Sequence, residues 1–262
     1  MIITADNLQI TNKKIEMALQ QKSKGPIQEM VQKCEAEGAE AIDINSGPLG
    51  KHPEEAMQFY VKTVQEATNL PILIDTANPR AMEAGLSVCK NPAIINGFSL
   101  EPKKVDGILP LAKKYNTDII GYLLYPNSQV PHDAGERLNI ASEILERALS
   151  EGIEKERLII DPVLVPLTWQ NGKQQAKDVL EVIRHLPDLF GFKVRTIIGL
   201  SNLTTGAGRK EKRIRFEKAY LPMIAAAGLD MVLMNVFHKE TVDIAKACNA
   251  LMDDKIFSWE GF

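Results

Sequence analysis

The stretch AEAIDINSGP, residues 39–48, begins as an apolar strand and ends in residues that form turns. Ile42 and Ile44 flank Asp43, and the strand stops at the residues NSGP that follow. A carboxylate in so apolar a strand is costly to bury unless it has a partner. Asp43 is therefore predicted either to face a polar site at a strand end or to accept hydrogen bonds from its own turn.

The same pattern recurs along the chain, where short apolar runs alternate with longer amphipathic segments. The runs expected as strands are residues 1–5, 39–44, 71–76, 93–96, 118–125, 157–161, 196–201 and 230–236. Apolar residues at helical spacing predict helices over residues 13–37, 53–68, 79–89, 101–115, 133–152, 174–186, 211–227 and 238–252.

Strict alternation of strand and helix predicts an α/β fold with parallel strands and right-handed crossovers. Eight repeats in 262 residues match the size and strand number of a (β/α)8 TIM barrel. A doubly wound open sheet is the alternative, but it normally has a glycine-rich turn after its first strand, where TADNLQI has none. Because no linker or low-complexity stretch interrupts the pattern, residues 1–262 are predicted to form a single domain.

Composition argues against several partners. A formal net charge of −3 and a pI near 5.9 predict no role at nucleic acids or at a membrane surface. Cys34, Cys89 and Cys248 show no metal-ligand spacing, so we expect free thiols in a reducing compartment. The first ten residues lack a signal peptide, and no apolar run approaches the length of a membrane span. We therefore expect a soluble cytoplasmic protein.

Polar side chains collect at the expected strand ends, which form the active-site face of such a barrel. Carboxylates and carboxamides can surround a flat heterocycle and accept paired N–H groups from an aminopyrimidine edge. The residues at these ends are Asp6, Asn7, Asp43, Asn45, Asp75, Asn78, Asn96, Asp161, Ser201, Asn202 and Asn235.

Other chemistries are disfavoured by what these ends lack. They hold no lysine for a Schiff base and no histidine, so an aldolase and a metal hydrolase are poorly supported and no bound metal is expected. Simpler structural roles stay open for several positions. Asp6, Asn7 and Asn45, like Asp43, can bond their own turns, and Asp161 before a proline can simply end a strand.

Five motifs in order, IDIN…GP, ILIDTAN, AIIN, LIIDPVL and IIGLSN, resemble the pterin-binding barrel of methyltetrahydrofolate-dependent methyltransferases. That family includes the methyltetrahydrofolate:corrinoid/iron–sulfur protein methyltransferases and the folate module of cobalamin-dependent methionine synthase. The resemblance covers essentially the whole chain. It implies methyl transfer between N5 of tetrahydrofolate and the cobalt of a corrinoid (cobalamin) carried by a partner protein, with the direction left open, and a homodimer.

The resemblance also implies roles for individual residues. Asn202 would approach N5 and act in catalysis, and the basic loop at Arg209 or Lys210 would meet the anionic tail of the folate. The positions implied to bind the pterin, or to line its pocket and floor, are Asp43, Asn45, Asp75, Asn96, Asp161, Gly199, Ser201 and Asn202. The first strand departs from the family, because Asp6 stands where a glutamate is usual.

Two further functions remain as alternatives. A dihydropteroate synthase uses the same pterin-binding acids and asparagine, but it has a lysine after strand 7 and Arg-x-His after strand 8. Here Asn202 and the sequence MNVFHK occupy those places, which disfavours displacement of pyrophosphate. The other alternative is a folate-binding protein without catalysis, against which the presence of Asn202 argues.

Overall fold

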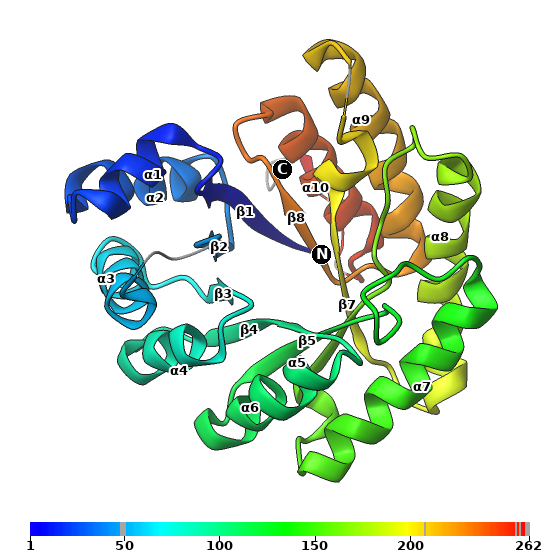
Figure 1. The fold of residues 1–262 in the computed structure, drawn as a ribbon. Helices are drawn as coiled ribbons and strands as arrows, with labels where there is room; N and C mark the ends of the chain where they lie inside the picture. The colour runs from blue at the N-terminus through cyan, green and yellow to red at the C-terminus, as the bar shows by residue number, and fades with distance from the viewer. Residues whose placement is uncertain (48–50, 207, 255, 257, 260–262) are drawn as a thin grey trace.

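The computed structural model describes residues 1–47, 51–206, 208–254, 256, 258 and 259. Its strands are parallel and pair in chain order, and the first closes on the last to form a barrel (Figure 1). The strands are β1 (Ile2–Gln9), β2 (Ala41–Asn45), β3 (Ile72–Asp75), β4 (Ala93–Phe98), β5 (Asp118–Tyr122), β6 (Leu158–Asp161), β7 (Arg195–Gly199) and β8 (Met231–Met234). The predicted (β/α)8 TIM barrel is thereby confirmed.

Helices surround the barrel on its outer side (Figure 1). They are α1 (Lys13–Gln20), α2 (Lys24–Ala36), α3 (Pro53–Gln65), α4 (Pro79–Val88), α5 (Pro102–Gly107), α6 (Leu109–Tyr115), α7 (Ala134–Glu151), α8 (Gly172–Phe190), α9 (Lys210–Ala227) and α10 (Lys239–Met252). Two 3₁₀ turns, η1 (Lys155–Arg157) and η2 (Leu200–Thr204), complete the connections. Among the described residues, no helix is both long and apolar enough to cross a membrane.

Two of the expected helices are each divided in the structure. The segment expected as one helix over 13–37 turns at Lys22, whose φ of 50° is left-handed, so α1 ends before α2 begins. The segment expected over 101–115 divides at Ile108, because Pro110 has no backbone N–H to continue the ladder of α5. The helical spacing of apolar residues continues through both breaks, so this spacing alone does not predict them.

Side chains along the strands alternate between the barrel interior and the helix layer. Inward residues from different strands pack on one another to form the inner core, namely Ala41, Leu73, Ile94, Ile120, Ile159, Ile197, Met231 and Leu233. The isoleucines between them, such as Ile42 and Ile44, pack in the larger core under the helices. Two residues beyond Ala41, the same inward side is taken by Asp43.

The first strand is longer than expected and irregular at its polar part. Ala5 pairs with Ile42 and Leu8 with Ile44, so the register shifts across Asp6 and Asn7. A bulge of this kind adds a residue to one strand and redirects its side chains, and bulges are frequent next to active sites. Asp6 and Asn7 therefore lie inside β1 rather than after it, at the end of the barrel where the other polar residues gather.

The three cysteines are free thiols, as predicted. Cys34 and Cys248 are buried, and Cys89 is half-buried. Burial raises the pKa of Cys34 to about 12, so this thiol stays protonated. Two residues of the predicted motifs and loops, Pro48 after the second strand and Ala207 in the loop after the seventh, lie outside the described residues.

Candidate active site

Asp43 on β2, Asn96 on β4 and Tyr122 on β5 form a hydrogen-bonded chain across the inside of the barrel. The Asn96 Nδ2 donates to Asp43 Oδ1 at 2.8 Å, and the Tyr122 hydroxyl donates to Asn96 Oδ1 at 2.5 Å. All three side chains face inward because each stands two residues after an inward aliphatic residue. Since both ends of the Asn96 amide are bonded, its orientation is fixed. Asp43 thus bonds a residue of β4, across the barrel interior, and its alternative role within its own turn is not what the structure shows.

Asn45 and Asp75 form a second link beside this chain. Asn45 Nδ2 donates to Asp75 Oδ2, while Asn45 Oδ1 accepts from the Gly47 N–H at 3.0 Å. Asn45 therefore has both roles that its sequence allowed, a turn bond and a bond across strands. We call these side chains, which lie at or within two residues of the ends of the adjacent strands β2 to β6, the acid–amide network: Asp43, Asn45, Asp75, Asn96, Tyr122 and Asp161.

Asp161 completes this side of the barrel end. Its Oδ1 accepts from the Val163 N–H at 2.7 Å, and Val163 has a φ of 60°. The carboxylate therefore does help to end the strand, as the simpler interpretation allowed. Behind it, the buried Arg137 donates from Nε to the Pro162 carbonyl at 2.9 Å and from a terminal nitrogen to Gln175, which supports this loop from below.

Burial shifts the protonation of the network acids. It raises the pKa of Asp75 to about 6, against the lowering effects of Lys104 and Asn45. It raises the pKa of Asp161 to about 7, opposed by the Val163 bond and by Arg137. Burial and the nearby Asp75 charge also raise the pKa of Asp43. These carboxyl groups are poorly solvated, so each favours a ligand that supplies N–H donors.

Each network acid keeps one oxygen available. Among the described residues, no side chain or N–H donates to Asp43 Oδ2, Asp75 Oδ1 or Asp161 Oδ2. Within the same described part of the chain, no group of three or more metal-ligating side chains stands close enough together to hold a metal ion. The available carboxylate oxygens can accept hydrogen bonds from a flat donor edge.

Asn202 differs from the network residues in position and environment. The strand expected over 196–201 ends at Gly199, so Ser201 and Asn202 belong to the 3₁₀ turn η2 that follows. Asn202 is exposed, and its carboxamide has no hydrogen-bond partner among the described residues. A Cβ on Gly199 would lie 3.0 Å from Asn202 Nδ2, so the glycine leaves room for this amide to lie against the strand end.

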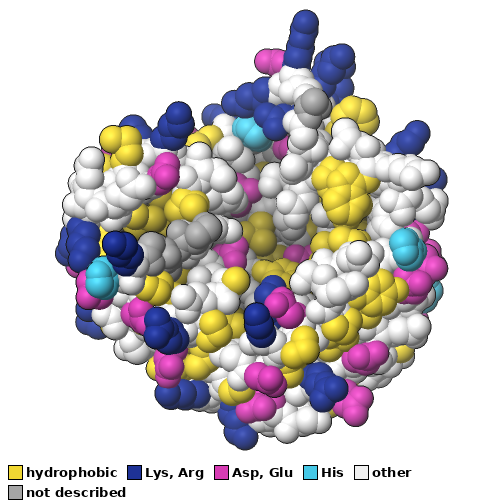
Figure 2. All heavy atoms as spheres, viewed as in Figure 1, with side chains coloured by type: hydrophobic (Ala, Val, Ile, Leu, Met, Phe, Trp, Pro, Cys, Tyr) yellow, Lys and Arg dark blue, Asp and Glu magenta, His cyan; other side chains and the backbone are white. Residues whose placement is uncertain are grey.

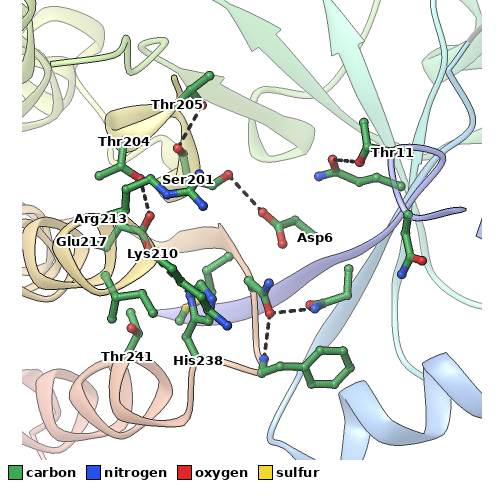
Figure 3. A pocket seen from close by; sticks show the side chains of 17 residues that line it. Asp6, Thr11, Ser201, Thr204, Thr205, Lys210, Arg213, Glu217, His238 and Thr241 are labelled. Carbon is green, nitrogen blue, oxygen red and sulfur yellow. Dashed lines mark hydrogen bonds and ion pairs between the residues drawn. The ribbon is translucent and has the colours of Figure 1, made fainter. Parts of the chain in front are cut away.

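The other side of the barrel end, between β7, β8 and β1, is hollowed into a cavity of about 480 Å³ (Figure 3). Asp6 reaches it from β1 and accepts from the Ser201 hydroxyl at 3.1 Å. Burial raises the pKa of Asp6 to about 6. Asn7 and Asn235 bond each other at 2.8 Å below it. We call this hollow the β1–β8 cavity.

Charged groups from α9 and the start of α10 line the outer part of this cavity. Glu217 is buried, accepts from Thr204 Oγ1, and lies 3.7 Å from His238 Nδ1. Burial lowers the pKa of His238, and the Lys210 and Arg213 charges act in the same direction. Figure 3 shows Lys210, Arg213 and Glu217 reaching the cavity from α9, across from Asp6.

Some positions that the sequence suggested lie elsewhere. Asn78 caps α4, where its Oδ1 accepts from the N–H groups of Arg80 and Ala81. Arg209 is exposed at the N-cap of α9, whereas the neighbouring Lys210 lines the cavity. The roles of Arg209 and Asn202 therefore stay predictions.

Other positions were missed by sequence reasoning. Tyr122 was passed over because the fifth strand was expected to run to Tyr125. Its position two residues after the inward-facing Ile120 could have identified it as an inward-facing residue. Arg213 and Glu217 lie on α9, away from the predicted strand ends, and no local signal marks the inward turn of Glu217.

Comparison with known proteins shows the family and the fold to which this barrel is similar. The family model described as "Pterin binding enzyme" matches residues 9–235 of the chain. The chain is 24% identical over 255 residues to a methylcorrinoid:tetrahydrofolate methyltransferase from Eubacterium limosum, covering 96% of this chain and 91% of that protein. It is also 21% identical over 213 residues to methionine synthase from Mycobacterium tuberculosis, a match covering 76% of this chain and 17% of that longer protein.

Among solved structures, the chain is similar to a dihydropteroate synthase from Coxiella burnetii in complex with pteroic acid. The TM-score is 0.72 at 16% identity, covering 95% of this chain and 92% of that chain, so this likeness concerns the fold. The family match extends from the end of the first strand to the residue after the last, and so includes all the network residues. The chain therefore belongs to the pterin binding enzyme family.

Proposed function

We propose that this protein is a methyltransferase that moves a methyl group between N5 of tetrahydrofolate and the cobalt of a corrinoid carried by a partner protein. The observation that carries the proposal is the acid–amide network on β2 to β6, together with the exposed Asn202 on the turn after β7, which has no side-chain hydrogen bond among the described residues. The similarity to a methylcorrinoid:tetrahydrofolate methyltransferase over 96% of this chain supports it. We retain the homodimer as part of this proposal.

The network suits the pterin because it offers acceptors to a neutral ring rich in N–H groups. In the proposed complex, Asp75 and Asp161 accept from the aminopyrimidine edge through their available oxygens, and Asn96 meets the ring in the orientation fixed by Tyr122 and Asp43. Hydrogen bonds to a charged acceptor are stronger than neutral ones, and the absence of water strengthens them further. Gly199 and Ser201 line the same end of the barrel, and the cations at the start of α9 meet the acidic tail.

The chemical step needs help at N5, because an amine nitrogen is a poor leaving group. When the methyl carbon leaves N5, the electron pair of that bond returns to N5 and must be stabilised by a proton. The partner's corrinoid would supply the cobalt nucleophile that takes the methyl group. Asn202 can hydrogen-bond N5 as its proton arrives, and it directly follows Ser201, whose hydroxyl donates to Asp6. An interaction made only in the transition state raises the rate rather than the affinity.

A dihydropteroate synthase is the second candidate, because structures of that enzyme share the fold. Against it, the residue after β7 that would need to be a lysine is Asn202, and the stretch after β8 lacks the Arg-x-His pair. The Lys210 and Arg213 side chains offer positive charge from α9 instead, a different element. A folate-binding protein without catalysis is the third candidate. The presence of Asn202, an amide that is not hydrogen-bonded to the acids of the network, argues against it.

A single-turnover experiment separates the three candidates. The protein is mixed with 5-methyltetrahydrofolate and Co(I) cobalamin, and methylcobalamin is followed by its absorbance. Methyl transfer accelerated over the reaction without protein is the expected result. Folate binding without transfer would leave only a binding function. Formation of dihydropteroate from a pterin diphosphate, p-aminobenzoate and Mg²⁺ would instead identify a synthase.

A further inference from the structure

A second hollow continues the β1–β8 cavity outward along the molecule. It has a volume of about 480 Å³ and lies between the starts of α9 and α10. Four residues line both hollows, namely Lys210, Ile214, Phe237 and His238. The two hollows therefore form one continuous path. We call its outer part, the second hollow, the α9–α10 groove.

The groove is rich in cations that the protein itself does not neutralise. Arg215, Lys218 and Lys239 line it beside Lys210. Of these four, Lys218 pairs with Glu240, and the others have no ion pair within the described part of the chain. Figure 2 shows Lys and Arg side chains gathered over the start of α9, next to the hollow at the barrel end. The only carboxylates lining the groove are Glu211 and Glu240 among the described residues.

The position of these cations opposes the preference of the helices that carry them. The N-terminus of a helix bears partial positive charge, so lysine and arginine are unfavourable there. Lys210 begins α9 and Lys239 begins α10, and Arg213 lies one turn into α9. A local rule broken in this way is typical of functional sites, where a bound partner supplies the compensation. An anion in the groove would offset both the side-chain charges and the two helix ends.

The order of groups along the path fits one kind of ligand. Hydrogen-bond acceptors lie at the barrel end, the 43% exposed Phe237 stands where the two hollows join, and the cations lie beyond it. We infer that the α9–α10 groove binds the γ-linked glutamates of a tetrahydrofolate that has an oligoglutamyl tail. This inference rests on the proposed function, because it takes the pterin to occupy the acid–amide network. Successive carboxylates would pair with Lys210, Arg215 and Lys239, and Phe237 would pack against the aminobenzoyl ring.

The experiment compares monoglutamyl and penta-γ-glutamyl tetrahydrofolate by calorimetry at low and high salt. We expect the pentaglutamyl form to bind about tenfold tighter at low salt, because exposed ion pairs contribute a few-fold each and salt screens them. The double variant Arg215→Gln/Lys239→Gln should lose most of this gain and keep the wild-type affinity for the monoglutamyl form. The control Lys90→Gln/Lys177→Gln removes the same charge at exposed positions outside the groove and should keep the gain.

The outcomes separate this inference from the proposed function. Failure of both folates to bind would overturn the proposed function and this inference with it. Binding of the monoglutamyl form with no further gain from the longer tail would overturn this inference alone. So would a groove variant that keeps the gain for the long tail but transfers methyl groups more slowly to a corrinoid protein, because the groove would then meet an acidic partner surface.

Discussion

Asp75, the last residue of β3, and Asp6, in the bulge of β1, lie at the same end of the barrel and have similarly raised pKa values, yet they are held in different ways. Asp75 accepts from the carboxamide of Asn45 on a neighbouring strand, in a network that extends from β2 to β6. Asp6 accepts from the hydroxyl of Ser201, in a cavity that Lys210 and Arg213 also reach. On one side of the barrel end the acids are held mainly by amides, and on the other side acids and cations line the same cavity.

This difference indicates which part of a ligand each side can bind. Acids that are tied to amides keep their remaining oxygens in fixed directions, which suits a rigid ring with several N–H donors. Cations at the outer end of an open groove are screened by water and mobile, which suits a flexible anionic chain. The same barrel end can thus hold one molecule with a neutral head and an acidic tail.

The largest effect is expected for protein stability, when a network acid loses its charge. Burial raises the pKa of Asp161 from 3.8 to about 7, so the folded protein keeps this proton where the unfolded chain has released it. Because the raised pKa favours the protonated form in the folded protein, the stability that Asp161 contributes is complete below pH 3.8 and is lost as the pH rises through 7. Asp161→Asn should therefore increase the unfolding free energy at pH 8, by on the order of 3 kcal/mol.

Denaturant unfolding at pH 5 and pH 8 checks this prediction, and the gain should be smaller at pH 5. The Asn side chain can still accept from the Val163 N–H, so the loop keeps its bond. Equal stability of the two proteins at pH 8 would mean that Asp161 is as well solvated in the folded protein as in the unfolded chain.

The next effect is expected at the border between the two sides. Asn202→Ala should lower kcat for methyl transfer roughly 10²-fold, because one hydrogen-bonding group would be lost at N5 in the transition state. Folate affinity should change much less, since Asn202 does not belong to the acid–amide network. Single-turnover transfer and equilibrium binding measure the two quantities. Transfer at the wild-type rate under saturation would leave Asn202 as a residue of the turn only.

A matched pair of variants tests the comparison itself. Asp75→Ala should weaken binding of 5-methyltetrahydrofolate at least about tenfold, because a charged acceptor is lost from the pterin site. Asp6→Ala removes a carboxyl group whose pKa is raised to the same extent but which lies on the cation-lined side. Its effect on folate affinity should be under about threefold. Calorimetric titration of both variants gives the result. Equal losses would contradict the division of the barrel end into two binding regions.

The smallest effect is expected for a residue that acts through another. Tyr122→Phe removes the hydroxyl that donates to Asn96 Oδ1 and leaves the ring in place. Folate affinity should fall about threefold, because the Asn96 amide keeps its bond to Asp43 but loses the second restraint on its orientation. A titration beside the Asp75→Ala variant measures this. A loss as large as that of Asp75→Ala would mean that Tyr122 touches the ligand directly.

Most of the fold could be predicted because its signals are local. Apolar runs of strand length, such as those around Ile42 and Ile74, alternate with amphipathic segments, and this order requires parallel strands. The residues that divide helices were less visible. Lys22 adopts a left-handed conformation that its residue type does not announce, and the break at Ile108 depends on a proline that is also common inside a first turn.

The candidate site was partly predictable for the same reason. Asp75 and Asp161 each end an apolar strand, and Asn96 lies two residues before the end of another, so their place at the barrel end followed from the strands themselves. Tyr122 and Glu217 could not be identified in this way. Tyr122 looked like one aromatic residue within a longer strand, and Glu217 looked like one charge on an exposed helix.

The sequence by itself determined the barrel, the end at which the polar residues gather and most of the acids and amides there. Periodicity carries that information, because a side chain two residues after an inward one also points inward. Only the tertiary structure decided which of these groups touch. Asn96 meets Asp43 across 53 positions of sequence, and Ser201 meets Asp6 across 195. Such contacts depend on strand register and on the bulge in β1, which arise from the packing of the whole barrel.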